Sequence, residues 1–278
     1  MKIQFLGTGA AEGIPAVFCN CEICRKIRSL GEAEFRTRSQ VIIDGVLSVD
    51  FPPEAFYHSI KFGAELSKLK YLLVSHSHMD HFYAHDFILR GYKYAELAED
   101  KLEIFGNSEV GKVFAECTER ELKPEVAPHI NFNEISPYSI FMIGGYKIMT
   151  LPAVHSKTEQ ALLFYIEREG KGYLHMYDTG IPDEGIYEFL SRNNVKADAV
   201  CFDCTFTDKV GGNSVRHMNI YDNMTVKSNL EKYAITDGGT RYIISHFSHN
   251  SNPTRLRLKS LEDKFGVTSA YDGFIIEI

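Results

Sequence analysis

The chain has 278 residues, of which 44% are hydrophobic, and this is enough apolar material for one α/β domain spanning residues 1–278. No apolar run approaches the roughly 20 residues of a membrane span, and the N-terminus has no secretory signal, so we expect a cytoplasmic protein without a membrane partner. The net charge of −7 argues against binding of long nucleic acid.

Three of the six cysteines are clustered near the N-terminus, in the segment FCNCEIC. Cys19, Cys21 and Cys24 lie within six positions, and a reducing compartment favours thiols or metal ligands over disulfides. Three thiolates supply three corners of a tetrahedral metal site, so the segment predicts a metal whose fourth ligand is remote in sequence. The alternative is three buried thiols without a metal. The other cysteines are expected to be buried, small hydrophobic residues: Cys117, Cys201 and Cys204.

Strand and helix signals alternate along the chain in two similar series. Hairpins of two strands are predicted at 40–49, 139–151 and 161–177, with Asp44-Gly45 and Gly144-Gly145 supplying the positive φ of tight turns. Short apolar runs predict buried strands at 71–75, 101–105, 197–202 and 241–245. Helical patterns span roughly 84–98, 108–122, 183–193, 219–234 and 253–265. This order predicts an α+β fold of two halves, each a mixed sheet covered by helices on its outer face.

The strongest functional signal follows the strand predicted at 71–75, in YLLVSHSHMDHF. His76, His78 and Asp80 alternate with other residues, so their side chains point to the same side where the strand ends, and His81 follows directly. Imidazole and carboxylate groups are the ligands of catalytic divalent metals that keep one position open for water. A polar loop without a metal is the alternative, which so dense a group of histidines disfavours.

The segment SHSHMDH resembles the His-x-His-x-Asp-His motif of the metallo-β-lactamase fold, a four-layer αββα sandwich with two metals at one edge. LPAVHSK, MYDTG and IISHFSH, each after a predicted strand, match the order of that family's remaining ligands. The ligand sets that the resemblance implies are His76, His78 and His155 for one metal, and Asp80, His81 and His246 for the other. Asp178 would bridge the two metals and, with Asp80, orient the attacking water.

Within this fold, FLGTGAAEGIPAVFCNCEIC is similar to the start of the PhnP family, phosphodiesterases of the phosphonate-degrading carbon–phosphorus lyase pathway. In that family an early Cys-x-Cys-x-x-Cys set binds a structural zinc together with a late histidine, which corresponds here to His249. RHMN, after a flexible GGNSVR segment, resembles the motif whose histidine protonates the leaving oxygen, which implies this role for His217. A supporting or surface role is the alternative for His217. Asp50-Phe51 and Ala84-His85 depart from the family's motifs, which leaves the rim of the site and the substrate open.

The implied function is a dinuclear metal-dependent phosphodiesterase that acts on a small ribose phosphodiester, cyclic phosphates included. Two divalent cations about 3.5–4 Å apart would clamp the anionic oxygens and lower the pKa of a bridging water. Mn²⁺, Zn²⁺ and Fe²⁺ all fit a ligand set without sulfur, and the family favours Mn²⁺; the cysteines would hold one structural Zn²⁺. The small substrate is the expected partner, and a homodimer stays open.

Three other functions are compatible with parts of the sequence. A tRNA 3′-processing endoribonuclease of the same fold would usually carry a long, basic, Gly-rich arm, which is not visible here. A thioester or lactone hydrolase can share the metal ligands, but would not be expected to have the early cysteines or a counterpart of His217. A non-catalytic metal-binding protein of cofactor biosynthesis keeps the zinc motif, and seven intact ligands argue against it.

Several polar residues outside these motifs have ordinary explanations. Asp203, in CFDCT, ends a predicted strand near the presumed site, where it either contributes to the site or caps the next turn. His85 lies one helical turn after His81, which makes it the strongest candidate among the remaining histidines. We expect core or surface positions for these four: His58, His85, His129 and His175.

Overall fold

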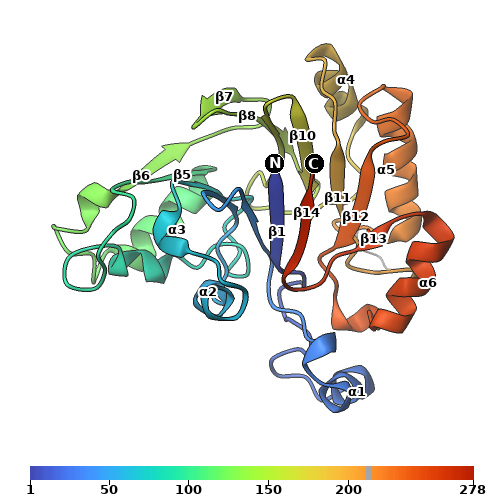
Figure 1. The fold of residues 1–278 in the computed structure, drawn as a ribbon, viewed down its shortest axis with the longest axis horizontal. Coiled ribbons are helices and arrows are strands. Elements are labelled where there is room, and N and C mark those ends of the chain that lie inside the picture. Colours follow the sequence, from blue (N-terminus) through green and yellow to red (C-terminus); the bar gives the residue numbers. More distant parts are fainter. Residues whose placement is uncertain (211–214) are drawn as a thin grey trace.

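Two seven-stranded sheets form the centre of the computed structural model, which describes residues 1–210 and 215–278 (Figure 1). The strands of the first sheet are, in spatial order, β14 (Phe274–Glu277), β1 (Lys2–Gly7), β2 (Gln40–Ile43), β3 (Leu47–Val49), β4 (Tyr71–Leu73), β5 (Leu102–Gly106) and β6 (Ile130–Glu134). Those of the second sheet are β13 (Thr268–Ser269), β12 (Arg241–Ser245), β11 (Ala199–Asp203), β10 (Lys171–Met176), β9 (Leu162–Arg168), β8 (Tyr146–Pro152) and β7 (Ile140–Ile143). Residues 211–214, part of the predicted flexible segment, lie outside the described residues.

Both sheets are mixed, and their pairing follows the same plan. β14, β1, β2 and β3 pair antiparallel, and β4, β5 and β6 then add in parallel. In the second sheet β7 to β10 pair antiparallel, and β11, β12 and β13 add in parallel. The three predicted hairpins are therefore present, and both residues of the two named turns have positive φ: Asp44, Gly45, Gly144 and Gly145.

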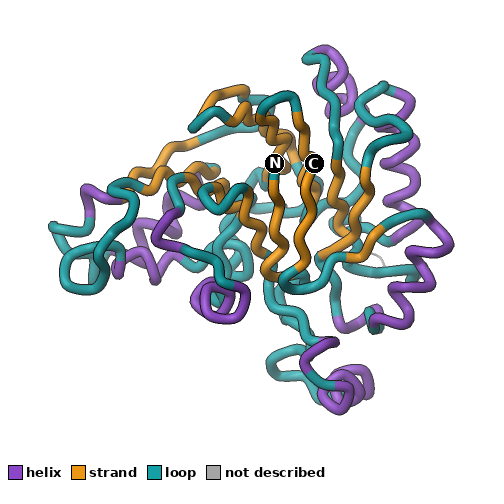
Figure 2. The backbone as a smooth tube through the Cα atoms, in the orientation of Figure 1, coloured by secondary structure: helices purple, strands orange, loops and turns teal. Residues whose placement is uncertain are grey.

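Helices cover the outer faces of the two sheets, as Figures 1 and 2 show. α2 (Ala55–Phe62) and α3 (Ser108–Thr118) lie on the side of the first sheet; α4 (Glu184–Arg192), α5 (Ile220–Lys232) and α6 (Arg255–Phe265) lie on the side of the second. α1 (Glu22–Leu30) stands apart, in the connection from β1 to β2. Short 3₁₀ helices are η1 (Glu32–Glu34), η2 (Leu66–Lys68), η3 (Ala84–Leu89), η4 (Ala127–His129) and η5 (His249–Ser251).

Three hydrophobic cores separate the layers. One core lies between the sheets and contains Val41 of β2 and Phe164 of β9. The neighbouring residue Ile42 belongs instead to the core shared with α2 and α3, because successive strand residues point to opposite faces. A third core packs β9 to β12 against α4, α5 and α6. Cores on both faces of each sheet define four layers, so the predicted αββα sandwich is confirmed.

The structure also corrects several sequence predictions. The helix predicted at 84–98 is only the 3₁₀ helix η3, because the positive φ of Gly91 (107°) and Tyr92 (53°) prevents a helix from continuing. α1, α2, β6, β13 and β14 were not predicted. Cys117 is half-buried rather than buried, whereas Cys201 and Cys204 are buried as expected.

None of the helices in residues 1–210 and 215–278 combines the length and apolar character needed to cross a bilayer.

Candidate metal centre

Three histidines meet at the edge where β4 and β8 end. His76 and His78 follow β4, and His155 follows β8, so this three-histidine group joins the two sheets. His78 Nδ1 lies 2.9 Å from His76 Nε2 and 3.2 Å from His155 Nε2. One ring nitrogen of each residue lies within 4.8 Å of the others, a spacing that suits three ligands of one divalent cation.

A second group contains Asp80 and His81 from the same loop, Asp178 after β10 and His246 after β12. All four residues are buried, and their ligand atoms lie within 4.8 Å of one another. Asp178 and His246 have positive φ values of 47° and 60°, which non-glycine residues rarely adopt. Strained backbone at two converging side chains is a feature of functional sites. We call these four and the three histidines together the His/Asp cluster.

Asp178 lies between the two groups. Its Oδ2 is 2.6 Å from His81 Nε2 and 3.4 Å from His76 Nε2, and its Oδ1 is 3.3 Å from His246 Nε2. The carboxylate therefore faces ligand atoms of both groups. A carboxylate in this position can be shared by two cations.

The His/Asp cluster passes a test of fit for metal ions. His81 Nε2, Asp178 Oδ1 and His246 Nε2 are buried and have no partner of hydrogen-bond geometry in the described structure, so their short polar contacts are ion-pair contacts within the site. On the other side of the rings, His81 Nδ1 lies 2.6 Å from Asp50 Oδ2 and His246 Nδ1 lies 2.9 Å from Thr205 Oγ1. Metal-binding histidines usually have such a partner on the second nitrogen. The unsatisfied atoms converge where a divalent cation would satisfy them.

Charge within the second group also favours a cation. Burial raises the pKa of Asp178, but the imidazoles of His246 and His81 outweigh it and hold that pKa well below its usual range. Burial lowers the pKa of His81, but Asp80, Asp50 and Asp178 outweigh it and raise that pKa well above its usual range. The carboxylates that favour a proton on His81 would equally favour a metal cation in its place.

His217, just ahead of α5, lies beside both groups. Its Nδ1 is 2.9 Å from Asp203 Oδ2 and 3.2 Å from Asp178 Oδ1, and its ring stacks on His246 with centroids 5.7 Å apart. Burial opposes protonation, but Asp203 and then Asp178 outweigh it and raise the pKa of His217 to about 9. The side chain is 21% exposed, so a substrate can reach it. The raised pKa favours the charged form of this imidazole, which lies next to the carboxylate of Asp178.

The sequence left two roles open for Asp203, a contribution to the site and a cap on the next turn, and the structure shows contacts for both. Its Oδ1 accepts hydrogen bonds from the backbone N–H groups of Thr205 and Met218, at 2.9 and 3.2 Å, and so fixes the turn. Its Oδ2 contacts His217. Asp50, which contacts His81, was noted in the sequence only as a departure from a motif. Asp50 directly follows β3 and Asp203 is the last residue of β11, and this placement at the ends of buried strands is the signal that could have identified them.

The early cysteines meet His249 at the N-terminus of α1. Cys24 Sγ lies 3.3 Å and Cys21 Sγ 3.6 Å from His249 Nδ1, and with Cys19 the four ligand atoms lie within 4.8 Å of one another. None of the cysteines is in a disulfide in the described structure. We call these four residues the Cys/His cluster; a metal held by all four would have no vacancy for chemistry.

The thiols of this cluster differ in acidity. The backbone N–H of Cys24, followed by His249, lowers the pKa of Cys21 to about 6. Burial raises the pKa of Cys24 to about 11. Cys21 precedes the first residue of α1, where the helix dipole favours an anion, so one thiolate is available at neutral pH.

The remaining histidines lie outside these clusters, within the described part of the chain. His58 is buried between Thr37 Oγ1 and Gln40 Oε1, each 2.7 Å away. His175 is buried in the core, where its Nδ1 lies 2.9 Å from Tyr173 Oη. His129, near Asp100, and His85 both lie at the surface. His85, the candidate exception, therefore joins no group.

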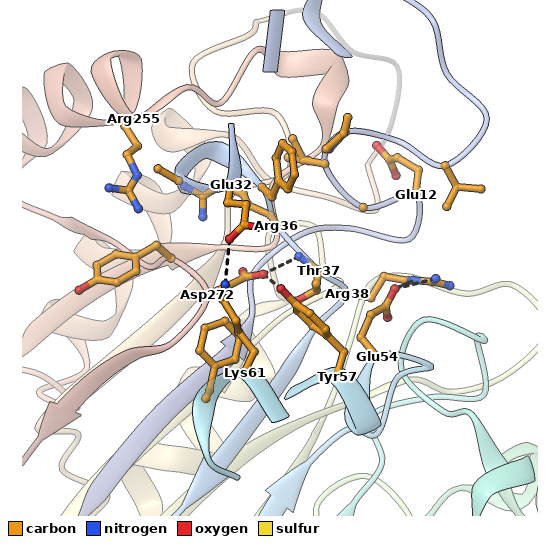
Figure 3. A pocket seen from close by; sticks show the side chains of 18 residues that line it. Glu12, Glu32, Arg36, Thr37, Arg38, Glu54, Tyr57, Lys61, Arg255 and Asp272 are labelled. Carbon is orange, nitrogen blue, oxygen red and sulfur yellow. Dashed lines mark hydrogen bonds and ion pairs between the residues drawn. The ribbon is translucent and has the colours of Figure 1, made fainter. Parts of the chain in front are cut away.

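A cavity of about 560 Å³ borders the connection from β1 to β2 and α2 (Figure 3). Ion pairs within its lining join Arg38 to Glu54 at 2.7 Å and Lys61 to Glu32 at 2.8 Å. No residue of the His/Asp cluster is among its lining residues in the described structure. The cavity nevertheless borders the motif loop, because Arg38 Nη1 also lies 3.3 Å from Met79 Sδ.

Comparisons with solved structures show the same fold at low sequence identity. A diphosphatase from the PhnP family is 18% identical with a TM-score of 0.72, over 100% of this chain and 97% of that one. Zn²⁺-bound PqqB from Methylobacterium extorquens is 17% identical with a TM-score of 0.74, and both chains are covered in full. Human tRNase Z, short form, is 17% identical with a TM-score of 0.68, over 100% and 99% of the chains.

Residues 39–247 match the beta-lactamase superfamily domain, a span that includes every residue of the His/Asp cluster. The chain therefore belongs to the beta-lactamase superfamily. It has the fold of a metallohydrolase, with groups of His and Asp residues suited to divalent metals. A comparison with curated proteins gives no match.

Proposed function

We propose that this protein is a dinuclear metal-dependent phosphodiesterase of the PhnP type, which hydrolyses a small ribose phosphodiester. The proposal includes one domain over residues 1–278, a cytoplasmic location and a small molecule, rather than long nucleic acid or a membrane, as its partner. The seven residues of the His/Asp cluster would hold two divalent cations, Mn²⁺ or Zn²⁺ with Fe²⁺ as a further option. The Cys/His cluster would hold one structural Zn²⁺.

The observation that carries the proposal is the pair formed by His217 and Asp203. His217 Nδ1 bonds to Asp203, and Nε2 has no hydrogen bond within the described part of the chain, so it can donate a proton to a substrate. Bound metals would neutralise the negative charge of Asp178. Asp203 would then be the carboxylate that keeps His217 protonated. An acid beside the metal ligands suits an ester with a poor alkoxide leaving group.

The residues of the chain divide the work between positioning and proton transfer. When bound, the two cations would neutralise the phosphate oxygens and supply a nucleophile from water at neutral pH. Asp178 and Asp80 would orient that water by accepting its hydrogen bonds. Asp50 and Thr205 would hold the rings of His81 and His246 in the ligating orientation. His217 would give its Nε2 proton to the departing oxygen.

The related folds offer three rival functions. tRNase Z shares the fold, but a net charge of −7 does not favour binding of a polyanion such as tRNA. A non-catalytic metal-binding protein is the second rival, against which stand the seven complete ligands and the buried, unpartnered atoms of the His/Asp cluster. A thioester hydrolase does not need an acid such as His217, because a thiolate leaves readily; a lactone expels an alkoxide, so the substrate panel below separates that rival.

Activity of the metal-loaded protein on a substrate panel tests the proposal. The panel contains an aryl phosphodiester, 2′,3′-cyclic nucleotides, ribose 1,2-cyclic phosphate, a diphosphate, pre-tRNA, a thioester and a lactone. We expect the highest kcat/KM on a small ribose phosphodiester. Turnover of thioesters or lactones alone, or of pre-tRNA alone, would overturn the proposal.

A further inference from the structure

The loop that carries His155 is held on one side at Val154, whose N–H donates to Thr179 Oγ1 at 3.0 Å and whose oxygen accepts from Gly180 N at 3.0 Å. It connects β8 to β9 over residues 153–161 without a helix or strand. The ring of His155 lacks the support that other ligand candidates have: its Nδ1 has no hydrogen-bond partner in the described structure, whereas His76 Nδ1 lies 3.0 Å from Ser75 Oγ. The position of His155 must therefore depend on how its loop is anchored.

Glu159, four residues after His155, anchors that loop to the first sheet. Its carboxylate accepts hydrogen bonds from Ser77 N at 3.0 Å, Ser77 Oγ at 2.7 Å and Asn107 Nδ2 at 2.8 Å. Ser77 stands between His76 and His78, so the anchor is attached to the loop that supplies the other two histidines.

Asn107 extends the anchor into regular structure. It follows β5, and its Oδ1 accepts a hydrogen bond from Val110 N at 3.0 Å as the N-cap of α3. Its Nδ2 also donates to the backbone oxygen of Gln160 at 3.0 Å. One carboxylate, that of Glu159, thus joins loops after β4, β5 and β8, which come from both sheets.

We propose that Glu159 is a positioning residue that closes the three-histidine group and sets the metal affinity of that group alone. The inference rests on the proposed dinuclear function. Removing Glu159 would free the loop of His155 from the loop of His76 and His78. The second group would keep its geometry, because its residues are buried and its rings have separate partners.

The test is a Co²⁺ titration of protein that mild chelation has freed of metal in the His/Asp cluster while zinc stays in the Cys/His cluster, followed by calorimetry and by absorption spectra. We expect wild type to bind two Co²⁺ in the His/Asp cluster. In Glu159→Gln, which keeps the side-chain shape but loses the charge, one site should weaken about 10- to 100-fold, the range for residues that orient metal ligands. The other site should stay within about 3-fold of wild type.

Reference variants identify which site has changed. The spectrum of Glu159→Gln at one equivalent of Co²⁺ should match that of His155→Ala, in which the three-histidine group is broken, and differ from that of Asp80→Ala. Glu167→Gln is the matched control. Glu167 is a half-buried glutamate eight residues further along, and it contacts Tyr165 and Lys147 rather than residues of the two groups, so this variant should leave both sites unchanged. Circular dichroism verifies that each variant is folded.

Two results would overturn this inference: equal weakening of both sites in Glu159→Gln, or two sites with wild-type affinity. A wild-type protein that binds no Co²⁺ in the His/Asp cluster would instead refute the proposed function. The two failures are therefore distinguishable.

Discussion

The His/Asp cluster and the Cys/His cluster are supported by different kinds of secondary structure. The His/Asp cluster collects residues that follow β4, β8, β10 and β12, so strands of both sheets hold it in place. In the Cys/His cluster, three of four residues come from one loop and the first turn of α1. The first cluster is mainly buried with unsatisfied atoms, and the second is partly exposed.

This difference suggests opposite relations between metal and fold. Strands would hold the His/Asp ligands in place without metal, so metal there serves chemistry. The connection of residues 8–39 contains α1 and η1 but no strand in the described structure, so metal in the Cys/His cluster would stabilise local structure. Four predictions test this contrast, from the largest expected effect to the smallest.

Replacing Asp178 with Ala should have the largest effect on activity and little on the fold. The two cations would lose their shared anion, so metal occupancy should fall and kcat/KM should drop by about 10³-fold or more, as for loss of a central catalytic group. Metal analysis and kinetics measure both. Full metal content with near-normal turnover would show that Asp178 is not shared.

Replacing His217 with Ala should lower kcat by roughly 10²–10⁴-fold for an ester with a poor alkoxide leaving group. The loss should be much smaller for an aryl ester, because a good leaving group needs little protonation. Metal content should not change; a fall would make His217 a ligand, as the proximity of Asp178, Asp203, His217 and His246 would allow. Equal loss on both esters would assign His217 to phosphate binding.

Mild chelation should remove the cations of the His/Asp cluster and abolish activity, while one zinc per chain remains. Cys21→Ser should lose that zinc and stability, because structural zinc contributes to folding directly. A loss of about 2 kcal/mol would lower Tm by roughly 4–8 °C in a chain of this size. Cys117→Ser, a half-buried cysteine outside the cluster, is the control. Equal zinc in wild type and Cys21→Ser would remove the contrast.

The smallest effect concerns the pH dependence of the metal-free protein. The pKa of His217 is raised from 6.5 to about 9, so its contribution to stability should be complete below pH 6.5 and lost as the pH rises toward 9. The difference in unfolding free energy between wild type and His217→Gln should shrink over that range, by at most about 3 kcal/mol. Urea unfolding at pH 6 and pH 9.5 measures it. A constant difference would mean that His217 is not paired with Asp203.

Much of the fold could be predicted because its strands carry local signals. Alternating apolar residues and the Asp44-Gly45 and Gly144-Gly145 turns identified three hairpins. α1 escaped prediction for a physical reason: it is highly polar and its N-cap is Cys21, so its residues suggested a metal site rather than a helix. The predicted helix 84–98 is interrupted at Gly91, where φ is positive. One glycine in an otherwise helical pattern was not enough to predict that interruption.

The candidate site divides in the same way. The motif at 76–81 is local and was visible directly, whereas the ligands at 155, 178 and 246 needed the resemblance to a known family. Asp50, Asp203 and Glu159 act through partners that are distant in sequence, such as His81, His217 and Ser77. A single sequence does not show which strands pair, so it cannot show such contacts.

The Cys/His cluster has a consequence for synthesis on the ribosome. Cys24 and His249 are 225 positions apart, so the cysteines emerge long before their fourth ligand. At about 5–20 residues per second, roughly 11–45 s separate the two events. During that time the nascent chain can offer a metal only its three cysteine thiolates as ligands. His249 arrives with the end of β12, so a stable, four-coordinate zinc would form only when the second sheet is being completed. Zinc retained after chelation would thus count the chains that have finished folding.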